Sequence, residues 1–369
     1  MGQPQAGNAQ SETGSSNAIR LSGREWLIVG AFALALFVLA PLCWQRVERL
    51  EPQPDYRIPY DLSNDYWLFT RCADAAVAAH DAVLIGDSVI WGQYVTREQT
   101  LSHYLNELAG RQRFANLGVD GAHPAALAGL LEHYAAGICG KDVLLHCNPL
   151  WMSSDKHDLR AKEEFRFNHP QLVPQFVPRI PCYKEEVSRR LGVVVGRNFP
   201  FNGWTSHLQL TYYDKMDIPS WTLEHPYDTP LKPLTFQLPP SDNKLRHEPI
   251  PWTQRPDARP LDFPWVGTDS SLQWRSFRRI LEVLTQRGNR VVVLVGPFNE
   301  HMLTANSREG YARVKRAIED WLRANSIPCL VPPALPTELY ADASHPLSEG
   351  YRLLAKQLFD AHFAGKESR

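Results

Sequence analysis

The sequence has almost no net charge. Its 39 Lys and Arg residues balance 40 Asp and Glu residues, which leaves a formal net charge of −1 over 369 residues. A chain that binds nucleic acid or another polyanion normally carries a basic excess, so this composition argues against a nucleic-acid partner. Hydrophobic residues make up 44% of the chain, enough to build the core of one large domain or two small ones.

The sequence also lacks paired cysteines of the CxxC type. Its six cysteines stand apart, at Cys43, Cys72, Cys139, Cys147, Cys182 and Cys329. Structural zinc sites usually take their ligands from closely spaced pairs, so we expect no metal site. A disulfide among these cysteines is compatible with the sequence, which does not determine its pairing. A Gly-x-Ser-x-Gly segment is absent too, which argues against an ordinary α/β-hydrolase.

Charged residues are missing from residues 26–44, whose core reads LIVGAFALALFVLAPL. That length suits a bilayer-spanning helix, and the tryptophan at each end suits the membrane interface. The alternatives are a cleaved signal peptide, a buried core helix, or lipoprotein processing at Cys43. The run ends in Pro41 and Leu42 rather than in the small residues of a cleavage site. We therefore predict an uncleaved transmembrane anchor over residues 22–44.

The segments that flank the apolar run differ in composition. Residues 1–21 are rich in Gly, Ser, Gln and Asn and predict a disordered tail, while the prolines of residues 45–63 predict an extended stalk. Arginines lie on both sides of the run, so the positive-inside rule hardly discriminates between orientations. A short tail inside and a large domain outside is the commoner arrangement. We expect a single-pass membrane protein whose domain is periplasmic or otherwise extracytoplasmic.

Residues 64–369 alternate between strand-like and helix-like patterns and predict one α/β domain. The strand-like runs are 81–86, 114–119, 142–147, 290–295 and 327–331. Helical patterns cover 64–79, 96–108, 124–136, 270–287, 310–324 and 347–363. This order predicts a parallel sheet of about five strands with helices on both faces.

The alternation is interrupted by a proline-rich insertion over residues 150–268. Sixteen of the chain's 29 prolines fall between Pro170 and Pro264, interspersed with tryptophans. So many prolines exclude long helices and central strands. The aromatic content favours an ordered cap or a partner-binding lobe over disorder. Its aromatics could stack on sugar rings, although aromatics that anchor loops are the commoner case.

Two short segments carry the chemistry that the sequence suggests. The first predicted strand ends in Gly86, followed by Asp87 and Ser88, and the carboxyl edge of an open α/β sheet is where ligands bind. On its own this segment could be a plain turn in which Asp87 or Ser88 caps the next helix. Far downstream, Asp342 and His345 stand three apart before a helical run. A serine nucleophile needs such a base and an orienting carboxylate.

With these residues the chain resembles the SGNH/GDSL hydrolase family. Gly86 to Ser88 match its first block, the segment from Asn116 to Gly121 matches the second, and Asp342 with His345 match the last. The third block, normally Gly-x-Asn-Asp, reads His146, Cys147, Asn148 and Pro149 here, so only the Asn is kept. The resemblance implies a flavodoxin-like three-layer sandwich, the SGNH hydrolase fold, and no cofactor.

The resemblance also implies roles for single residues. Ser88 would be the nucleophile, His345 its general base and Asp342 the orienting carboxylate, while Ser88, Gly121 and Asn148 would form the oxyanion hole. Asn148 could instead shape the turn before Pro149.

Three histidines lie near the same predicted edge of the sheet. His301 follows the fourth predicted strand and is a candidate substrate contact. His146, where the family has Gly, is another candidate, although an isolated histidine of this kind is more often structural. His123 could line the same edge.

Three functions fit these residues. The first is an esterase acting on acyl esters of a cell-envelope glycan or lipid. The second is an O-acyltransferase of an exopolysaccharide or envelope polymer that uses the same triad. The third is a non-catalytic binding module with the same fold, which the altered third block favours and the complete Ser–His–Asp set opposes.

Overall fold

The computed structural model describes residues 21–364 of the chain. The chain divides into two units, Met1–Val47 and Glu48–Arg369. The predicted tail over residues 1–21 lies outside the described residues except for Leu21.

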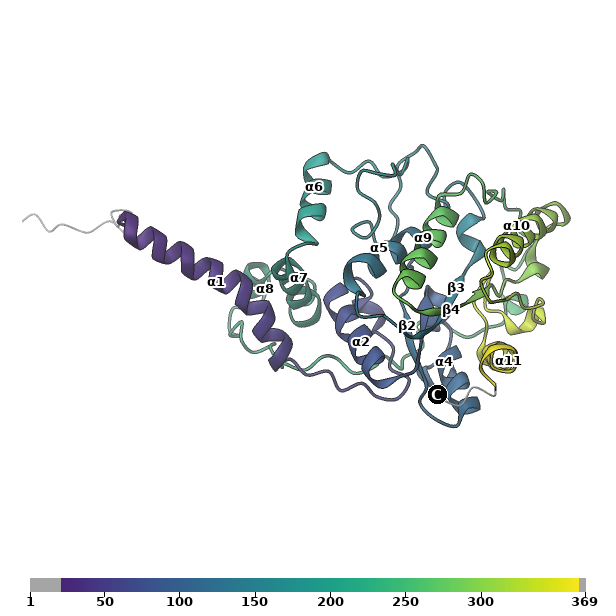
Figure 1. Ribbon diagram of the computed structural model, residues 1–369, viewed down its shortest axis with the longest axis horizontal. Coiled ribbons are helices and arrows are strands. Elements are labelled where there is room, and N and C mark those ends of the chain that lie inside the picture. Colours follow the sequence, from purple (N-terminus) through teal and green to yellow (C-terminus); the bar gives the residue numbers. More distant parts are fainter. Residues whose placement is uncertain (1–20, 365–369) are drawn as a thin grey trace, which may run out of the picture. The chain divides into compact units, whose positions relative to one another are not determined.

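The first unit contains helix α1 (Gly23–Val47), shown in purple in Figure 1. It has 25 residues, and the mean hydropathy of its most apolar 18-residue stretch is 2.5. Large apolar side chains such as Trp26, Leu27 and Phe32 are exposed along it. The prediction of one N-terminal helix long and apolar enough to cross a bilayer is confirmed by these properties.

The second unit is built on a five-stranded sheet in the order β2-β1-β3-β4-β5. Its strands are β1 (Ala82–Gly86), β2 (Phe114–Gly118), β3 (Asp142–Cys147), β4 (Arg290–Val295) and β5 (Cys329–Leu330). Every neighbouring pair runs parallel. The predicted α/β class and parallel sheet of about five strands are therefore confirmed. Only β5 is much shorter than its predicted range.

Helices cover both faces of this sheet (Figure 1). One face carries α2 (Tyr66–Ala79), α5 (Pro124–Tyr134), α9 (Leu272–Gln286) and α10 (Ala305–Ala324). The other face carries α3 (Ser88–Trp91), α4 (Leu101–Ala109) and α11 (Ser348–Leu358), the last followed by a π-turn, η8 (Phe359–Phe363). Successive side chains of a strand point to opposite faces, so Val83 and Ile85 join the first core and Ala82 and Leu84 join the second.

Helix boundaries follow capping residues. Asp65 accepts a hydrogen bond from the Leu68 N–H and starts α2, within two residues of the predicted start at residue 64. Thr100 caps α4, which begins later than predicted because residues Arg97–Gln99 form a separate 3₁₀ turn, η3. Thr304 caps α10, which begins earlier than predicted.

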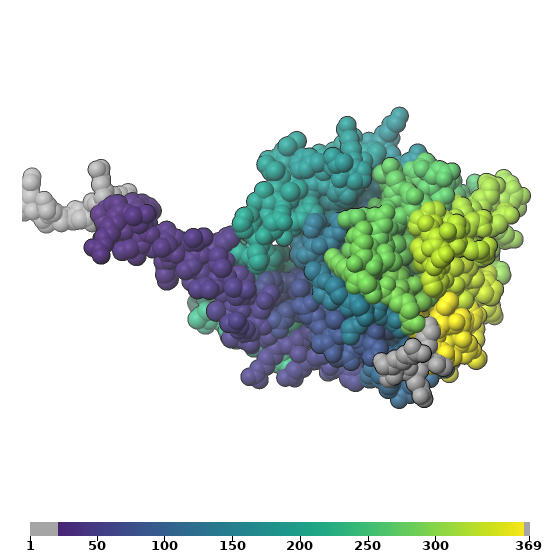
Figure 2. All heavy atoms as spheres, in the orientation of Figure 1, coloured from purple at the N-terminus to yellow at the C-terminus, as the bar shows by residue number. Residues whose placement is uncertain are grey.

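The insertion between β3 and β4 is ordered and contains three helices. No helix was predicted in this proline-rich segment. The three helices are α6 (Val187–Gly196), α7 (Pro200–Tyr212) and α8 (Ile218–Glu224). Pro200 and Pro219 stand in the first turn of α7 and α8, where the missing N–H costs no hydrogen bond. Figure 2 shows these residues, in teal, on the surface of the second unit. The remaining short 3₁₀ turns are η2 (Tyr60–Leu62), η4 (Pro149–Met152), η5 (Trp252–Gln254), η6 (Glu300–Met302) and η7 (Thr337–Leu339).

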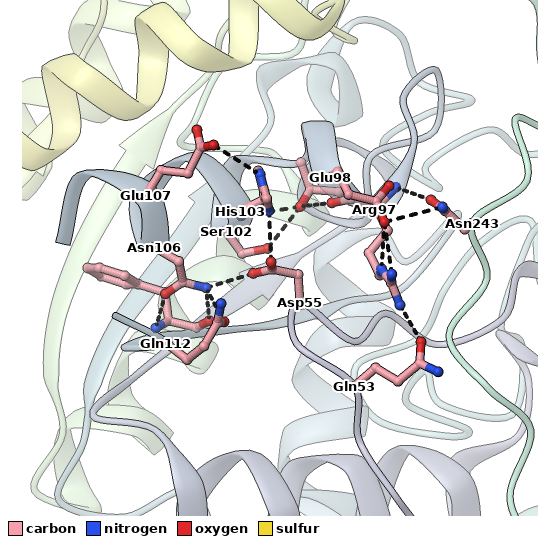
Figure 3. A network of polar contacts seen from close by, with 12 residues as sticks. Gln53, Asp55, Arg97, Glu98, Ser102, His103, Asn106, Glu107, Gln112 and Asn243 are labelled. Carbon is pink, nitrogen blue, oxygen red and sulfur yellow. Dashed lines mark hydrogen bonds and ion pairs between the residues drawn. The ribbon is translucent and has the colours of Figure 1, made fainter. Parts of the chain in front are cut away.

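The predicted stalk over residues 45–63 is wrong from Glu48 onward. Asp55 accepts hydrogen bonds from His103 (2.8 Å) and Asn106 (2.7 Å), in the network that Figure 3 shows. Arg57 is fully buried, and its guanidinium donates to the carbonyls of Gly92 (2.8 Å) and Asp242 (2.7 Å). This segment is therefore part of the packed domain rather than a spacer.

All six cysteines lie in the described part of the chain, and all six are free thiols. Cys72, Cys147 and Cys182 are buried. The disulfide that the sequence left open is thus absent among residues 21–364.

Candidate active site

Two loops at the carboxyl edge of the sheet bring the predicted triad together. Ser88 begins α3 directly after β1, while Asp342 and His345 lie in the loop before α11. Gly86 ends β1 at a point where a side chain has no room. A Cβ there would lie 2.5 Å from Ile90 Cγ1 and 2.7 Å from His146 Cβ. The glycine thus allows α3 to turn tightly off the strand and present Ser88.

The three side chains form a continuous hydrogen-bonded chain. The Ser88 Oγ lies 2.8 Å from His345 Nε2, and His345 Nδ1 lies 2.8 Å from both carboxylate oxygens of Asp342. Because a carboxylate only accepts, Nδ1 carries the proton and Nε2 is left to accept from the serine hydroxyl. The N–H groups of Ser344 and His345 also donate to Asp342 Oδ1, at 3.0 Å each. The loop therefore fixes both the carboxylate and the imidazole tautomer.

The electrostatics match this geometry. Burial on its own raises the pKa of Asp342, but the adjacent His345 and the hydrogen bonds it receives hold that pKa well below its usual range. Burial lowers the pKa of His345, but Asp342 outweighs it and the net pKa is raised. Ser88 and His345 are each 8% exposed, so the pair lies in a largely dry setting. The arrangement can hold a proton at His345 while Asp342 stays ionised.

Asp87 is the centre of a second, buried network beside the nucleophile. Its Oδ1 accepts from the Val89 N–H and from His146 Nδ1, both at 3.0 Å. Its Oδ2 accepts from Asn148 Nδ2 at 2.8 Å and from Trp151 Nε1 at 2.9 Å. Burial on its own raises the pKa of Asp87. The nearby His146 and the hydrogen bonds from His146 and Asn148 lower it by more, so the net pKa is well below the usual range. The capping role that the sequence allowed for Asp87 is real, but it is only one of four contacts.

His146 occupies the place where the resembled family has glycine, and its contacts are internal. Besides Asp87, its Nε2 lies 3.1 Å from the Gly296 carbonyl. Both ring nitrogens thus face acceptors inside the protein. The side chain is 1% exposed, so its position is that of a buried partner of Asp87 rather than of a group facing solvent.

Asn148 has contacts compatible with both roles that the sequence left open. Its Oδ1 accepts from the Leu150 N–H at 3.1 Å, which caps the turn η4. Its Nδ2 donates one hydrogen to Asp87, and its second amide hydrogen has no partner within residues 21–364. The Asp87 contact fixes the orientation of the amide, so the remaining hydrogen has a defined direction.

Gly121, the second predicted oxyanion donor, has a φ of +67°. A Cβ at this position would collide with the side-chain amide of Asn168. Both facts require glycine here. The N–H groups of Gly121 and of Ser88, the latter in the first turn of α3, donate to no other group in the described part of the chain.

The other two histidines lie apart from the triad's hydrogen bonds. His301 is exposed, and its Nε2 lies 3.2 Å from the Leu335 carbonyl. His123 is buried and caps α5, and burial lowers its pKa to about 3. No hydrogen bond links either ring to Ser88, Asp342 or His345 in the segment 21–364.

The structure adds residues that the sequence did not single out. The Tyr94 ring lies 5.5 Å from the His345 ring, the His247 ring lies 5.2 Å from Tyr94, and the Arg255 guanidinium lies 5.4 Å above Tyr94. His247 and Arg255 come from the insertion, which therefore returns to the site. Of these three residues, only Tyr94 could have been suspected from the sequence, because it follows Ser88 by six positions.

No group of three or more His, Cys, Asp or Glu residues is placed to hold a metal ion between residues 21 and 364. No family model matches the chain, and no curated protein sequence matches it.

Proposed function

We propose that the protein is a membrane-anchored serine esterase that hydrolyses acyl esters through an acyl-enzyme on Ser88, as a relative of the SGNH/GDSL hydrolases that it resembles. The observation that carries the proposal is the unbroken set of 2.8 Å contacts from Ser88 Oγ through His345 to Asp342. This is the geometry in which a base removes the hydroxyl proton of a serine.

In the first half of the reaction, Ser88 Oγ attacks the carbonyl carbon of the ester while His345 Nε2 takes the hydroxyl proton. Asp342 stabilises the imidazolium that forms. When the carbonyl re-forms, the carbon–oxygen bond to the alcohol breaks, and the alcohol leaves with the proton from His345. A water molecule, deprotonated by His345, then attacks the acyl group and releases the acid and free Ser88.

The negative oxygen formed in each half needs fixed donors. The N–H groups of Ser88 and Gly121 and the unpaired amide hydrogen of Asn148 are available for it. Such donors stabilise the transition state because they are already oriented and largely dry. Asp87 contributes indirectly, since its contact with Asn148 sets the amide direction.

The anchor is the second part of the proposal. Helix α1 would hold the protein in the membrane, with the Glu48–Arg369 unit on the extracytoplasmic side. The length of α1, its hydropathy and its exposed apolar side chains support this role. Retention of the full-length protein in the membrane fraction through a carbonate wash is the expected result, and release by carbonate would contradict it.

A fluorophosphonate probe tests the nucleophile. The full-length protein in detergent should be labelled, and Ser88→Ala should lose labelling with an unchanged circular dichroism spectrum. Ser276→Ala is the matched control, because the Ser276 hydroxyl bonds only the Leu272 carbonyl one turn earlier in α9. Equal labelling of folded Ser88→Ala and wild type would remove Ser88 from the reaction.

A further inference from the structure

A polar pocket lies next to the loop that carries Gly121. Its volume is about 330 Å³, and its walls come from the segment around Tyr60, from Asp120, from the insertion residues around Asn168, and from Lys215. None of these residues belongs to the triad.

Three observations join this pocket to the triad's surroundings. Asp120 directly precedes Gly121, and its carbonyl accepts a hydrogen bond from His169 Nε2 at 2.8 Å, which ties the insertion loop to this turn. The amide of Asn168 stands against the Cα of Gly121, where a side chain would collide with it. The Tyr60 ring packs edge-on against Trp91, in the short helix that Ser88 begins, with centroids 5.8 Å apart.

The pocket presents polar groups that the protein does not use internally. The Asp120 carboxylate, the Asn168 side-chain amide, the Arg166 guanidinium and the Tyr60 hydroxyl have no hydrogen-bond partner in the described chain from 21 to 364. Together they offer an acceptor-only group, a donor-only group and two groups that do both. Burial raises the pKa of Asp120, and the Asp120 carboxylate is in turn the main cause of the raised pKa of Tyr60. Both residues line the pocket.

The charges around the pocket cancel. Asp61 and Asp120 oppose Arg166 and Lys215, so an anion such as phosphate gains no net attraction. An acyl chain is disfavoured too, because it would leave the polar groups without partners. A neutral molecule rich in hydroxyl groups can satisfy donors and acceptors together. The Tyr60 and Phe167 side chains in the wall add carbon atoms that the C–H groups of such a molecule can contact.

We infer that this pocket binds a neutral sugar unit, either of the ester substrate or of an acceptor for its acyl group. The inference rests on the proposed function, since it places the sugar beside an acyl-enzyme on Ser88. It goes beyond that function because it selects a glycan over a lipid as the molecule that is recognised.

The test compares two esters with full-length protein in detergent. The probes are p-nitrophenyl acetate, which has no sugar, and O-acetylated cellobiose. Asn168→Ala and Arg166→Ala should each raise KM for acetylated cellobiose about tenfold, the effect of losing one good hydrogen bond. Arg166→Ala should leave kcat/KM for p-nitrophenyl acetate within twofold of wild type, whereas Asn168→Ala is judged on KM alone because Asn168 packs against the oxyanion donor Gly121. Arg179→Ala is the matched control, since Arg179 is exposed on the same insertion and does not line the pocket.

A binding measurement separates this inference from the proposed function. Calorimetric titration of the Ser88→Ala variant with free cellobiose should show binding. The double variant Ser88→Ala/Asn168→Ala should bind cellobiose about tenfold more weakly. Inorganic phosphate should not compete with cellobiose. Activity on p-nitrophenyl acetate with no cellobiose binding would overturn the sugar pocket and leave the esterase standing. Cellobiose binding without any esterase activity would overturn the esterase and leave the sugar pocket standing. When wild type is given p-nitrophenyl acetate and free cellobiose, acetylated cellobiose as product identifies an acceptor, and acetate alone identifies the ester substrate.

Discussion

His207, outside the candidate site, is the centre of a buried ionic cluster whose protonation should control the stability of the domain. Its Nε2 lies 2.7 Å from Glu48 Oε1, and its Nδ1 lies 2.8 Å from Asp65 Oδ2. The His207 side chain is 0% exposed. Because both partners are carboxylates, both ring nitrogens must donate, and only the charged ring can do so.

The size of the effect follows from the pKa. Burial alone lowers the pKa of His207, but the hydrogen bonds to Asp65 and Glu48 raise it to about 9. In the unfolded chain a histidine titrates near about 6.5. The folded state therefore binds the proton more tightly, and its stabilisation is complete below pH ~6.5 and lost as the pH rises through ~9. A difference of about 2.5 pH units corresponds to about 3 kcal/mol of unfolding free energy.

Urea unfolding of the full-length protein in detergent, followed by tryptophan fluorescence from pH 6 to 9.5, measures this loss. Wild type should lose about 3 kcal/mol across the range. His207→Gln should be less stable at pH 6.5, since two buried carboxylates lose their partner, and should lack most of the slope. His225→Gln, in the same insertion, should keep the wild-type slope. The reasoning fails if His207→Gln and wild type show the same dependence on pH.

Three further predictions concern the site and the domain boundary. Asn148→Ala should lower kcat and kcat/KM alike by roughly 10²–10³-fold in ester hydrolysis, because the lost contact forms mainly in the transition state; nearly unchanged turnover of the folded variant would leave Asn148 only as the cap of its turn. The kcat/KM of wild type should rise with pH through an apparent pKa above ~6.5, because Asp342 outweighs burial and raises the pKa of His345, and only the neutral ring accepts a proton; a profile that falls between pH 6 and 8 would contradict this role. A chain beginning at Glu48 should be soluble and active, whereas one beginning at Leu50 should be less stable by about 3 kcal/mol in urea, since it loses a buried partner of the His207 cluster; equal stability of the two chains would show that Glu48 contributes nothing.

The sheet could be predicted from sequence because its signal is local. Each of β1 to β4 is a short apolar run, and β3 and β4 begin and end where the pattern does. The packing of the segment after Glu48 could not be predicted, because the residues that it contacts are far away in the sequence. Arg57 is polar and stands among prolines, and it is buried only because carbonyls such as that of Asp242, 185 positions away, accept its hydrogen bonds. Composition alone therefore predicts a stalk.

The same contrast divides the site. Ser88, Asp342 and His345 lie in short segments whose residue types already suggest their chemistry, and the fold brings them within hydrogen-bonding distance. The walls of the site were not predictable, because Arg255 comes from an insertion with no periodic pattern. Nor does the indole of Trp151 carry any sequence signal for its bond to Asp87.

In the proposed function, the Asp87 network orients the Asn148 amide although the block around Asn148 differs from that of the SGNH/GDSL family. In the resembled family a glycine and a second aspartate flank the asparagine, whereas here they are His146 and Pro149. A buried carboxylate is costly unless its oxygens are fully hydrogen-bonded, and His146 supplies one of the four hydrogen bonds that Asp87 accepts. Asp87 can then stay ionised and accept from Asn148, which holds the amide with one hydrogen left over. The histidine therefore supports the asparagine from behind, so its presence does not argue against an oxyanion donor at Asn148.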